Sequence, residues 1–300
     1  LLASPAAAQH VMPWQETVVS VREFEPSTRL FAVAGKWRVV SKGKLERGEL
    51  NYWKLPSEAK ASYQLLCAPD VSTGCIRFVR VKGVAQRPIR RAVRPWDTGG
   101  IYSVMVRSND VEELFQQALD MGWWAEAQPI RFTFGASDLR NVVLTGPDGI
   151  NVAVYERISP PFNAFPVGKM SQAFNSMRMV RDKVVARAFY EKQLGFSALF
   201  DSGREAPNPT PSNLSIPLNF TPTVRRDAAA LQPVPGETGR VEVMQINGFT
   251  GLDMSEHAVM PNLGIISVRY PVKGLAAYRA MLERNGVGIA YSADNVKIGG

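Results

Sequence analysis

The sequence predicts an α+β protein built from four related modules in two halves. Residues 100–104 (GIYSV), which run on to Gly122, read in the same register as residues 264–268 (GIISV), which run on to Gly286. In each stretch an apolar strand is followed by an amphipathic helix that ends at glycine, and the two stretches are 164 residues apart throughout. A repeat with a constant offset of this size indicates a duplicated architecture.

The first and third modules show the same relationship. Residues 16–23 (ETVVSVRE) align with residues 175–182 (NSMRMVRD), and both read as strands. A helix is predicted after each, over 26–34 and 184–194, and each ends at a glycine, Gly35 or Gly195, as a left-handed C-terminal cap requires. Every module therefore begins strand, helix, strand and continues into a short antiparallel run.

The later strands follow from local patterns. A turn, Gly146-Pro147-Asp148-Gly149, precedes an alternating segment that predicts the closing strand of the second module at 151–156. In the first module we expect strands at 37–42, 50–55, 62–68 and 75–81.

These elements predict two domains on either side of a linker. The predicted boundaries are a leader at 1–10, a first domain at 11–158 (modules 11–82 and 98–158), a proline-rich linker at 159–171, and a second domain at 172–300 (modules 172–248 and 262–300). The fourth module lacks room for its last strands, so we expect the chain to be a fragment.

Composition and the N-terminal residues indicate which kinds of partner and which cellular compartment to expect. The chain is basic, with 35 Lys and Arg against 27 Asp and Glu, and part of this excess lies at 80–94. That strip lacks regular aromatic residues and is interpreted as a solvated connector, so no nucleic-acid partner is expected. No apolar run is long enough to cross a bilayer, so no membrane partner is expected. The start LLASPAAAQH resembles the end of a secretory signal peptide, which favours a periplasmic or secreted protein. The oligomeric state is left open.

The two cysteines flank a turn-like segment. Cys67 and Cys75 could face each other across a hairpin, and an oxidising compartment would permit a disulfide. Two buried free thiols are the alternative.

Two motifs resemble the vicinal oxygen chelate superfamily of glyoxalases, bleomycin resistance proteins and extradiol dioxygenases. Phe189-Tyr190 followed by Leu194-Gly195-Phe196 looks like the end of that superfamily's helix, and the 146–149 turn with a strand ending in Glu156 looks like its closing hairpin. The resemblance implies βαβββ modules that pair into cupped mixed sheets around a ligand cavity.

In that superfamily a divalent ion is held by residues of the first and last strands of paired modules. The corresponding first-strand positions here are Glu16, Ser103, Asn175 and Ser267, and the last-strand positions are Arg77, Ala153 and Glu242. None of them is histidine, and the only histidines, His10 and His257, lie elsewhere. We therefore predict no cofactor and place no metal ligands, although a divalent metal is possible if the missing last strand of the fourth module supplies another carboxylate.

These positions still predict a ligand site. Glu16 and Arg77 would face each other as an ion pair that fills the cup, or Arg77 would hold a substrate carboxylate. Asn175, Glu242 and Ser267 would form a polar cluster for a neutral or protonated organic ligand, with Ser103 as a further ligand-binding residue. Glu242 is the candidate general base, because partial burial would raise its pKa toward neutrality.

Three functions follow from this pattern. The first is a metal-independent superfamily member that binds a small organic molecule, with or without catalysis. The alternatives are a divalent-metal-dependent lyase or ring-cleaving dioxygenase, and a non-enzymatic scaffold whose sites have degenerated.

Overall fold

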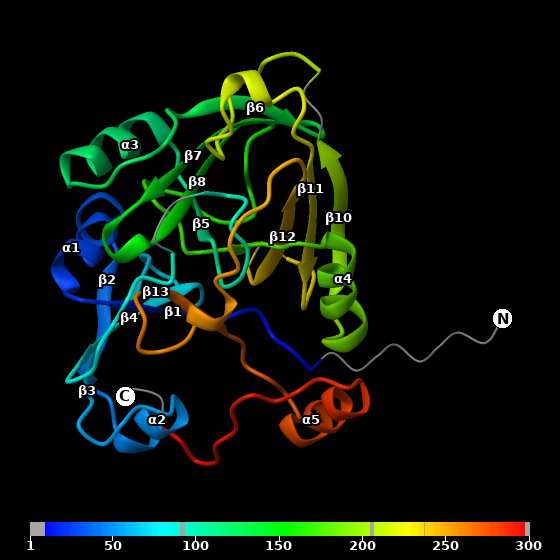
Figure 1. Cartoon of the computed structure of the whole chain (residues 1–300). Helices are drawn as coiled ribbons and strands as arrows, with labels where there is room; N and C mark the ends of the chain where they lie inside the picture. The colour runs from blue at the N-terminus through cyan, green and yellow to red at the C-terminus, as the bar shows by residue number, and fades with distance from the viewer. Residues whose placement is uncertain (1–9, 91–93, 205–206, 237, 298–300) are drawn as a thin grey trace.

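The computed structural model describes residues 10–90, 94–204, 207–236 and 238–297. The predicted leader therefore lies outside the described residues, except for His10. Two mixed sheets, one of five strands and one of eight, make up the fold (Figure 1). The longest helices in the described part of the chain have ten residues, and none of those described could cross a bilayer.

The first module begins strand, helix, strand, as predicted. Its strands are β1 (Glu16–Val21), β2 (Arg38–Lys44), β3 (Lys60–Cys67) and β4 (Cys75–Lys82); its helices are α1 (Phe24–Arg29), extended by a π-helical turn (Leu30–Ala34), and α2 (Arg47–Tyr52).

The strand predicted at 50–55 is wrong, because most of that segment belongs to helix α2 and the turn after it. Leu50 and Trp53 are both buried and are three residues apart, which places them on one face of a helical turn. The spacing by three fits a helical face, not the alternation of a strand.

The other modules repeat the pattern. Module two comprises β5 (Ser103–Arg107), α3 (Val111–Asp120), β6 (Ile130–Phe134), β7 (Ser137–Thr145) and β8 (Asn151–Ser159). Module three comprises β9 (Asn175–Met179), α4 (Lys183–Ala188) with a π-helical turn (Phe189–Gln193), β10 (Ser197–Arg204), β11 (Arg226–Gln232) and β12 (Arg240–Ile246). The described part of module four comprises β13 (Gly264–Arg269) and α5 (Leu275–Arg284).

The modules pair differently from the predicted consecutive halves. In the eight-stranded sheet, β5 of module two lies antiparallel to β9 of module three, with Ser103 opposite Met177 and Met105 opposite Asn175. In the five-stranded sheet, β1 of module one lies antiparallel to β13 of module four. The inner two modules therefore share one sheet and the outer two share the other, so pairing crosses the boundary predicted at 159–171.

The packing of the first two modules explains this arrangement. Phe31, which follows helix α1, lies 6.1 Å from Trp123 after helix α3, measured between ring centroids. Both belong to one apolar cluster that includes Val19 of β1 and Val104 of β5. Modules one and two therefore meet through their helices, and their first strands remain available to other modules.

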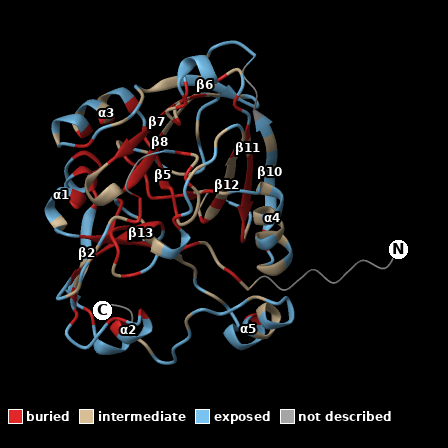
Figure 2. Ribbon diagram, in the orientation of Figure 1, coloured by how far each residue is buried: buried red, intermediate tan, exposed pale blue. Residues whose placement is uncertain are grey.

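Burial is concentrated in the inner strands of the sheets, whereas edge strands such as β2 and much of the helices are exposed (Figure 2). On the concave side of the five-stranded sheet, called here the first cup, an apolar cluster joins Val18 and Val79 to Leu50 and Trp53 of the α2 region. On the concave side of the eight-stranded sheet, the second cup, the corresponding cluster includes Met105 and Met177.

The glycine caps are confirmed in part. Gly195 has the predicted left-handed conformation, with φ of 75°. Gly35 does not, since its φ is −76°, and Lys36 takes the left-handed position instead with φ of 58°. Gly35 is needed for a different reason: a Cβ there would lie 2.7 Å from the carbonyl oxygen of Phe31.

Cys67 and Cys75 form a disulfide, which settles the alternatives left open by the sequence. They end β3 and begin β4, next to the paired residues Leu66 and Ile76, and their Cα atoms are 4.4 Å apart. This distance lies at the short end of the range for disulfides.

Candidate functional site

The first cup holds the Glu16–Arg77 pair that the sequence predicts. Arg77 Nε donates a hydrogen bond to Glu16 Oε1 (2.8 Å), and Nη2 donates one to Oε2 (2.9 Å). Both side chains are buried. Burial opposes the charge on the guanidinium, but the bonds to Glu16 outweigh it and raise the pKa of Arg77. The ion pair is therefore confirmed.

Two further charged residues, not found from the sequence, complete a buried network. Arg269 of β13 donates from Nη1 to Glu16 Oε1 and from Nη2 to Glu49 Oε1, each at 2.8 Å. The guanidinium of Arg77 also lies over the ring of Tyr63, 4.5 Å from its centroid. Positive and negative groups alternate, so each buried charge lies next to an opposite one, while Arg77 Nη1 and Glu49 Oε2 have no hydrogen-bond partner among the described residues. Together with the α2 region, these side chains fill the first cup.

The second cup contains a cavity of about 460 Å³. Its walls are mainly apolar and come from both modules; they include Met105, Phe132, Phe134, Met177, Leu199 and Phe200. Phe134 of β6 and Phe200 of β10 meet with their ring centroids 5.1 Å apart. Since these strands are the two edges of the eight-stranded sheet, this contact draws the sheet around the cavity.

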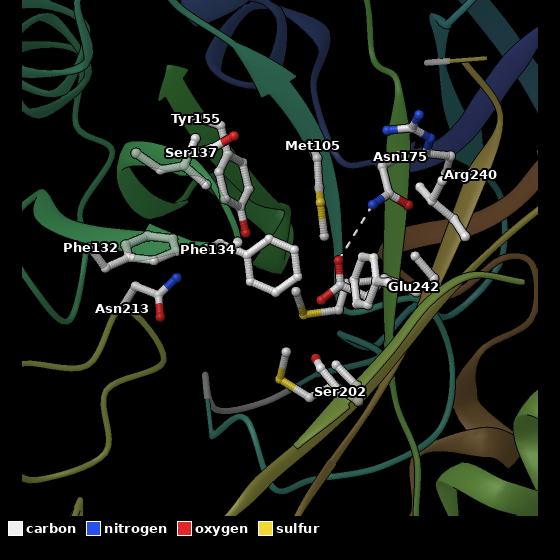
Figure 3. A pocket seen from close by; sticks show the side chains of 18 of the residues that line it. Met105, Phe132, Phe134, Ser137, Tyr155, Asn175, Ser202, Asn213, Arg240 and Glu242 are labelled. Atoms are coloured by element: carbon white, nitrogen blue, oxygen red, sulfur yellow. Dashed lines mark hydrogen bonds between the residues drawn. The ribbon is translucent and has the colours of Figure 1, made fainter. Parts of the chain in front are cut away.

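A carboxyl group lies at the floor of this cavity. Glu242 of β12 and Asn175 of β9 line it, and Asn175 Nδ2 donates a long hydrogen bond of 3.4 Å to Glu242 Oε2 (Figure 3). Burial raises the pKa of Glu242 to about 7, against the smaller opposing effect of the bond from Asn175. A carboxyl group with this pKa can both accept and donate a proton near neutral pH.

The donors in the second cup do not fit a divalent transition metal. Such ions favour histidine nitrogen, thiolate and carboxylate ligands, usually three or more from the protein. Glu242 provides one carboxylate, and the matching last-strand position of module two is Ala153, which has no donor. Within the described ranges, no three His, Cys, Asp or Glu residues gather as a metal site would require.

The module pairing separates the two predicted serines from the Asn175–Glu242 pair. Ser267 lies on β13 opposite Val18 of β1, in the other sheet, so the predicted cluster of Ser267 with Asn175 and Glu242 is wrong. It depended on pairing modules three and four. Ser103 lies in the same sheet as Asn175, but its buried hydroxyl does not line the cavity.

Sequence reasoning missed the basic residues of the cavity. Arg107, Arg157, Arg226 and Arg240 all line it. Three of them could have been predicted, because every second side chain of a strand points to the same face, and each of the three lies an even number of residues from a position already considered. Arg107 is four residues from Ser103, Arg157 is four from Ala153, and Arg240 is two from Glu242. The two-residue repeat of a strand would therefore have placed Arg107, Arg157 and Arg240 on the cavity face.

Comparison with known proteins addresses the fold. No protein-family model matches the chain, and no curated protein matches its sequence. Among solved structures, glyoxalase I from Zea mays superposes with a TM-score of 0.57 at 14% identity, covering 91% of this chain and 79% of that one. A mutant of the same enzyme gives 0.57 at 13%, covering 91% and 80%. A putative dioxygenase from Bacillus subtilis gives 0.42 at 10%, covering 95% and 99%.

Sequence identity of 10–14% to these structures supports a shared fold and nothing more specific. The expectation of an α+β protein with cupped mixed sheets is confirmed, and the chain has the fold of glyoxalase I and of the vicinal oxygen chelate proteins that its motifs resemble.

Proposed function

We propose that this chain binds a small organic molecule in its second cup, without the divalent metal site of the superfamily that it resembles. The observation that carries the proposal is a cavity of about 460 Å³ around one carboxyl group, for which the described residues supply no basic hydrogen-bond partner. Ligand sites in proteins are typically concave, mostly apolar and supplied with a few polar groups that orient the ligand.

The two cups support this assignment by contrast. In the first cup, Arg77 and Arg269 are both bonded to Glu16, and the α2 region packs over the sheet. The first cup therefore fits the alternative function of a non-enzymatic scaffold whose site is filled by side chains. In the second cup the corresponding volume is a cavity, and the bond that Glu242 accepts from Asn175 is long, at 3.4 Å.

The same residues could support proton transfer. Glu242, with its raised pKa, would accept a proton from a bound ligand and return it at another position, while Asn175 holds the carboxyl group toward the cavity. An isomerisation of this kind moves one proton and leaves a transient negative charge on the ligand, which a hydrogen-bond donor or positive group of the cavity would have to stabilise. A divalent-metal-dependent lyase or dioxygenase remains the alternative, and it requires ligands other than those described in this cup.

The disulfide bears on where the protein works. Disulfides form and persist mainly in oxidising compartments. The Cys67–Cys75 bond therefore supports the proposal of a periplasmic or secreted protein.

The test combines metal analysis with ligand screening. Purified protein, dialysed with and without a chelator, is analysed for bound metals and screened by thermal shift against a library of small organic molecules. We expect no stoichiometric divalent ion, and hits whose shift is lost in the Asn175→Ala, Glu242→Ala double variant. The matched control is Arg80→Met, which changes an exposed ion pair in the other sheet and should keep every hit.

Two results would count against the proposal. One tightly bound divalent ion per chain that is lost in the double variant would place a metal in the second cup. Hits that respond equally in the double variant and the control would place the ligand elsewhere.

A further inference from the structure

The charges around the second cup indicate which ligands it would take. Of the titratable groups that line the cavity in the described part of the chain, the strongly basic ones are four arginines, on β5, β8, β11 and β12: Arg107, Arg157, Arg226 and Arg240. The acidic group is Glu242, and Tyr155 adds a phenol. Guanidinium groups in the wall of a cavity favour an anionic ligand over a cationic one.

Two of these arginines share one wall. Arg107 on β5 and Arg157 on the adjacent strand β8 both lie over the ring of Phe162, with their Cζ atoms 4.1 and 5.4 Å from its centroid. Arg107 also lies 4.4 Å from the centroid of Phe174, so its guanidinium packs against two rings. Aromatic faces stabilise guanidinium groups and fix their orientation.

Arg157 is the side chain of this wall most available to a ligand. Arg107, Arg226 and Arg240 have additional interaction partners in the protein. The Nε of Arg157 is buried and has no hydrogen-bond partner among the described residues. A buried donor in this state favours a bound acceptor, and a planar guanidinium matches the two oxygens of a carboxylate.

Glu242 does not oppose an anion while it is protonated. Its hydrogen-bond partner is Asn175, and burial keeps its carboxyl group neutral up to a pH near 7. The charged groups that line the same cavity are Arg240 on its own strand, Arg226 on β11, Arg107 on β5 and Arg157 on β8, and β9 adds the amide of Asn175. A neutral acid at the floor and guanidinium groups on the wall suit a ligand with one anionic end.

Building on the proposed function, we propose that the second cup binds an organic acid, with its carboxylate at the Arg107–Arg157 wall and an apolar or aromatic body reaching toward Glu242. The body would lie against the ring and thioether side chains of the cavity, such as Phe132, Phe134 and Met105. Ionisation of Glu242 adds a negative charge to the same cavity, so affinity for the acid falls as the pH rises through the neutral range.

The test uses three probes of one shape: 2-naphthoate, its neutral amide and 2-naphthylmethylamine. Binding is measured by calorimetry at pH 6 and pH 8. We expect the carboxylate to bind more tightly than the amide, and the amine to bind least. Arg157→Gln should weaken the carboxylate roughly tenfold or more without affecting the amide. Arg157→Lys, which keeps the charge but not the fork, should restore part of the affinity.

Controls separate charge from position. Arg131→Gln removes the same charge from an exposed ion pair with Asp138 on the neighbouring hairpin, and should leave binding unchanged. In the parent protein we expect carboxylate binding to weaken roughly three- to tenfold from pH 6 to pH 8, and Glu242→Gln should abolish this change. Thermal unfolding confirms that each variant is folded.

The outcomes distinguish this inference from the proposed function. If the amine binds best, or if Arg157→Gln and Arg131→Gln lose carboxylate affinity equally, the organic-acid assignment is overturned while the cavity remains a ligand site. The assignment is also overturned if none of the three probes binds although the library gives other hits in this cup. If neither probes nor library bind, the proposed function itself fails.

Discussion

Arg77 forms a two-bond ion pair with Glu16, at 2.8 and 2.9 Å, at the first- and last-strand positions of module one where a metal would be held in the superfamily that the chain resembles. The equivalent positions of module three hold Asn175 and Glu242, whose single bond is 3.4 Å long. One fold thus carries two cups in opposite states. The first is closed by paired charges, and the second contains a cavity.

Breaking the pair in the first cup should be costly. Arg77→Met leaves Glu16 facing Arg269 alone and removes two buried hydrogen bonds. Loss of one partner of a buried ion pair costs about 3–5 kcal/mol, so we expect a loss of that order in the free energy of unfolding, measured with urea. The Glu16→Gln, Arg77→Met double variant should lose less than the sum of the single variants, because neither partner is then left unpaired.

Arg80→Met is the matched control for this prediction. Arg80 lies on the same strand and pairs with the exposed Glu23. Exposed pairs are worth about 0–1 kcal/mol, so the change should be small. Similar losses in the Arg77 and Arg80 variants would contradict the stabilising role assigned to the buried network.

The disulfide should also contribute to stability. The bond closes a short loop between β3 and β4, from Cys67 to Cys75. Chain-entropy arguments give about 2–3 kcal/mol for a loop of this length, so the Cys67→Ala, Cys75→Ala variant should unfold at lower urea concentration. Protein purified without reductant should show no thiol by colorimetric titration in denaturant. Two reactive thiols in that assay would show that the bond is not formed in the isolated protein.

The contact between Phe134 and Phe200 should control access to the second cup. Their rings meet at 5.1 Å between the edge strands β6 and β10. Phe134→Ala should open this side of the cavity and raise the dissociation rate of a bound naphthoate about two- to tenfold, the range expected for loss of an aromatic pair. Stopped-flow fluorescence measures this rate. Phe220→Ala, at a partly exposed ring that does not line the cavity, should leave the rate unchanged, and an equal effect of both variants would reject the gate.

The module pattern was readable from the sequence because it is local. The strand β8 and the positive φ of Gly195 each depend on neighbouring residues, and both were predicted, although β8 is buried over its first four residues and does not alternate. The ion pair between Glu16 and Arg77 was also predictable, since first and last strands of one module are parallel neighbours.

The partners of each module were not readable in this way. A sequence repeat predicts the strands and helices within each module. Which modules pair through their first strands depends on how the helices pack. Ser267 was therefore assigned to the wrong cup, and Arg269 was not recognised as the third member of the Glu16–Arg77 network. Arg157 was missed for a different reason: only the metal position of β8 was read, although its alternate residues face the same cavity.

The ionisation of Glu242 should make stability depend on pH in a defined direction. Its pKa is about 7 in the folded protein, above the ordinary value of 4.5, so the folded state binds more protons than the unfolded state between these values. The stability associated with the neutral carboxyl group is fully present below pH 4.5 and is lost as the pH rises through 7. Glu242→Gln should remove this loss, because the amide cannot ionise.

We expect the free energy of unfolding of the Gln variant to exceed that of the parent at pH 8 by roughly 1–3 kcal/mol, with the difference shrinking as the pH falls toward 5. The upper end applies if the cavity stays dry, and water entering it would reduce the effect. Glu156→Gln is the control, since Glu156 lies on the same sheet but bonds to Arg140 and does not line the cavity. Urea unfolding of the parent and of the Gln variant at several pH values measures this difference. A difference in the free energy of unfolding that does not change with pH would show that Glu242 titrates normally and is not enclosed as described.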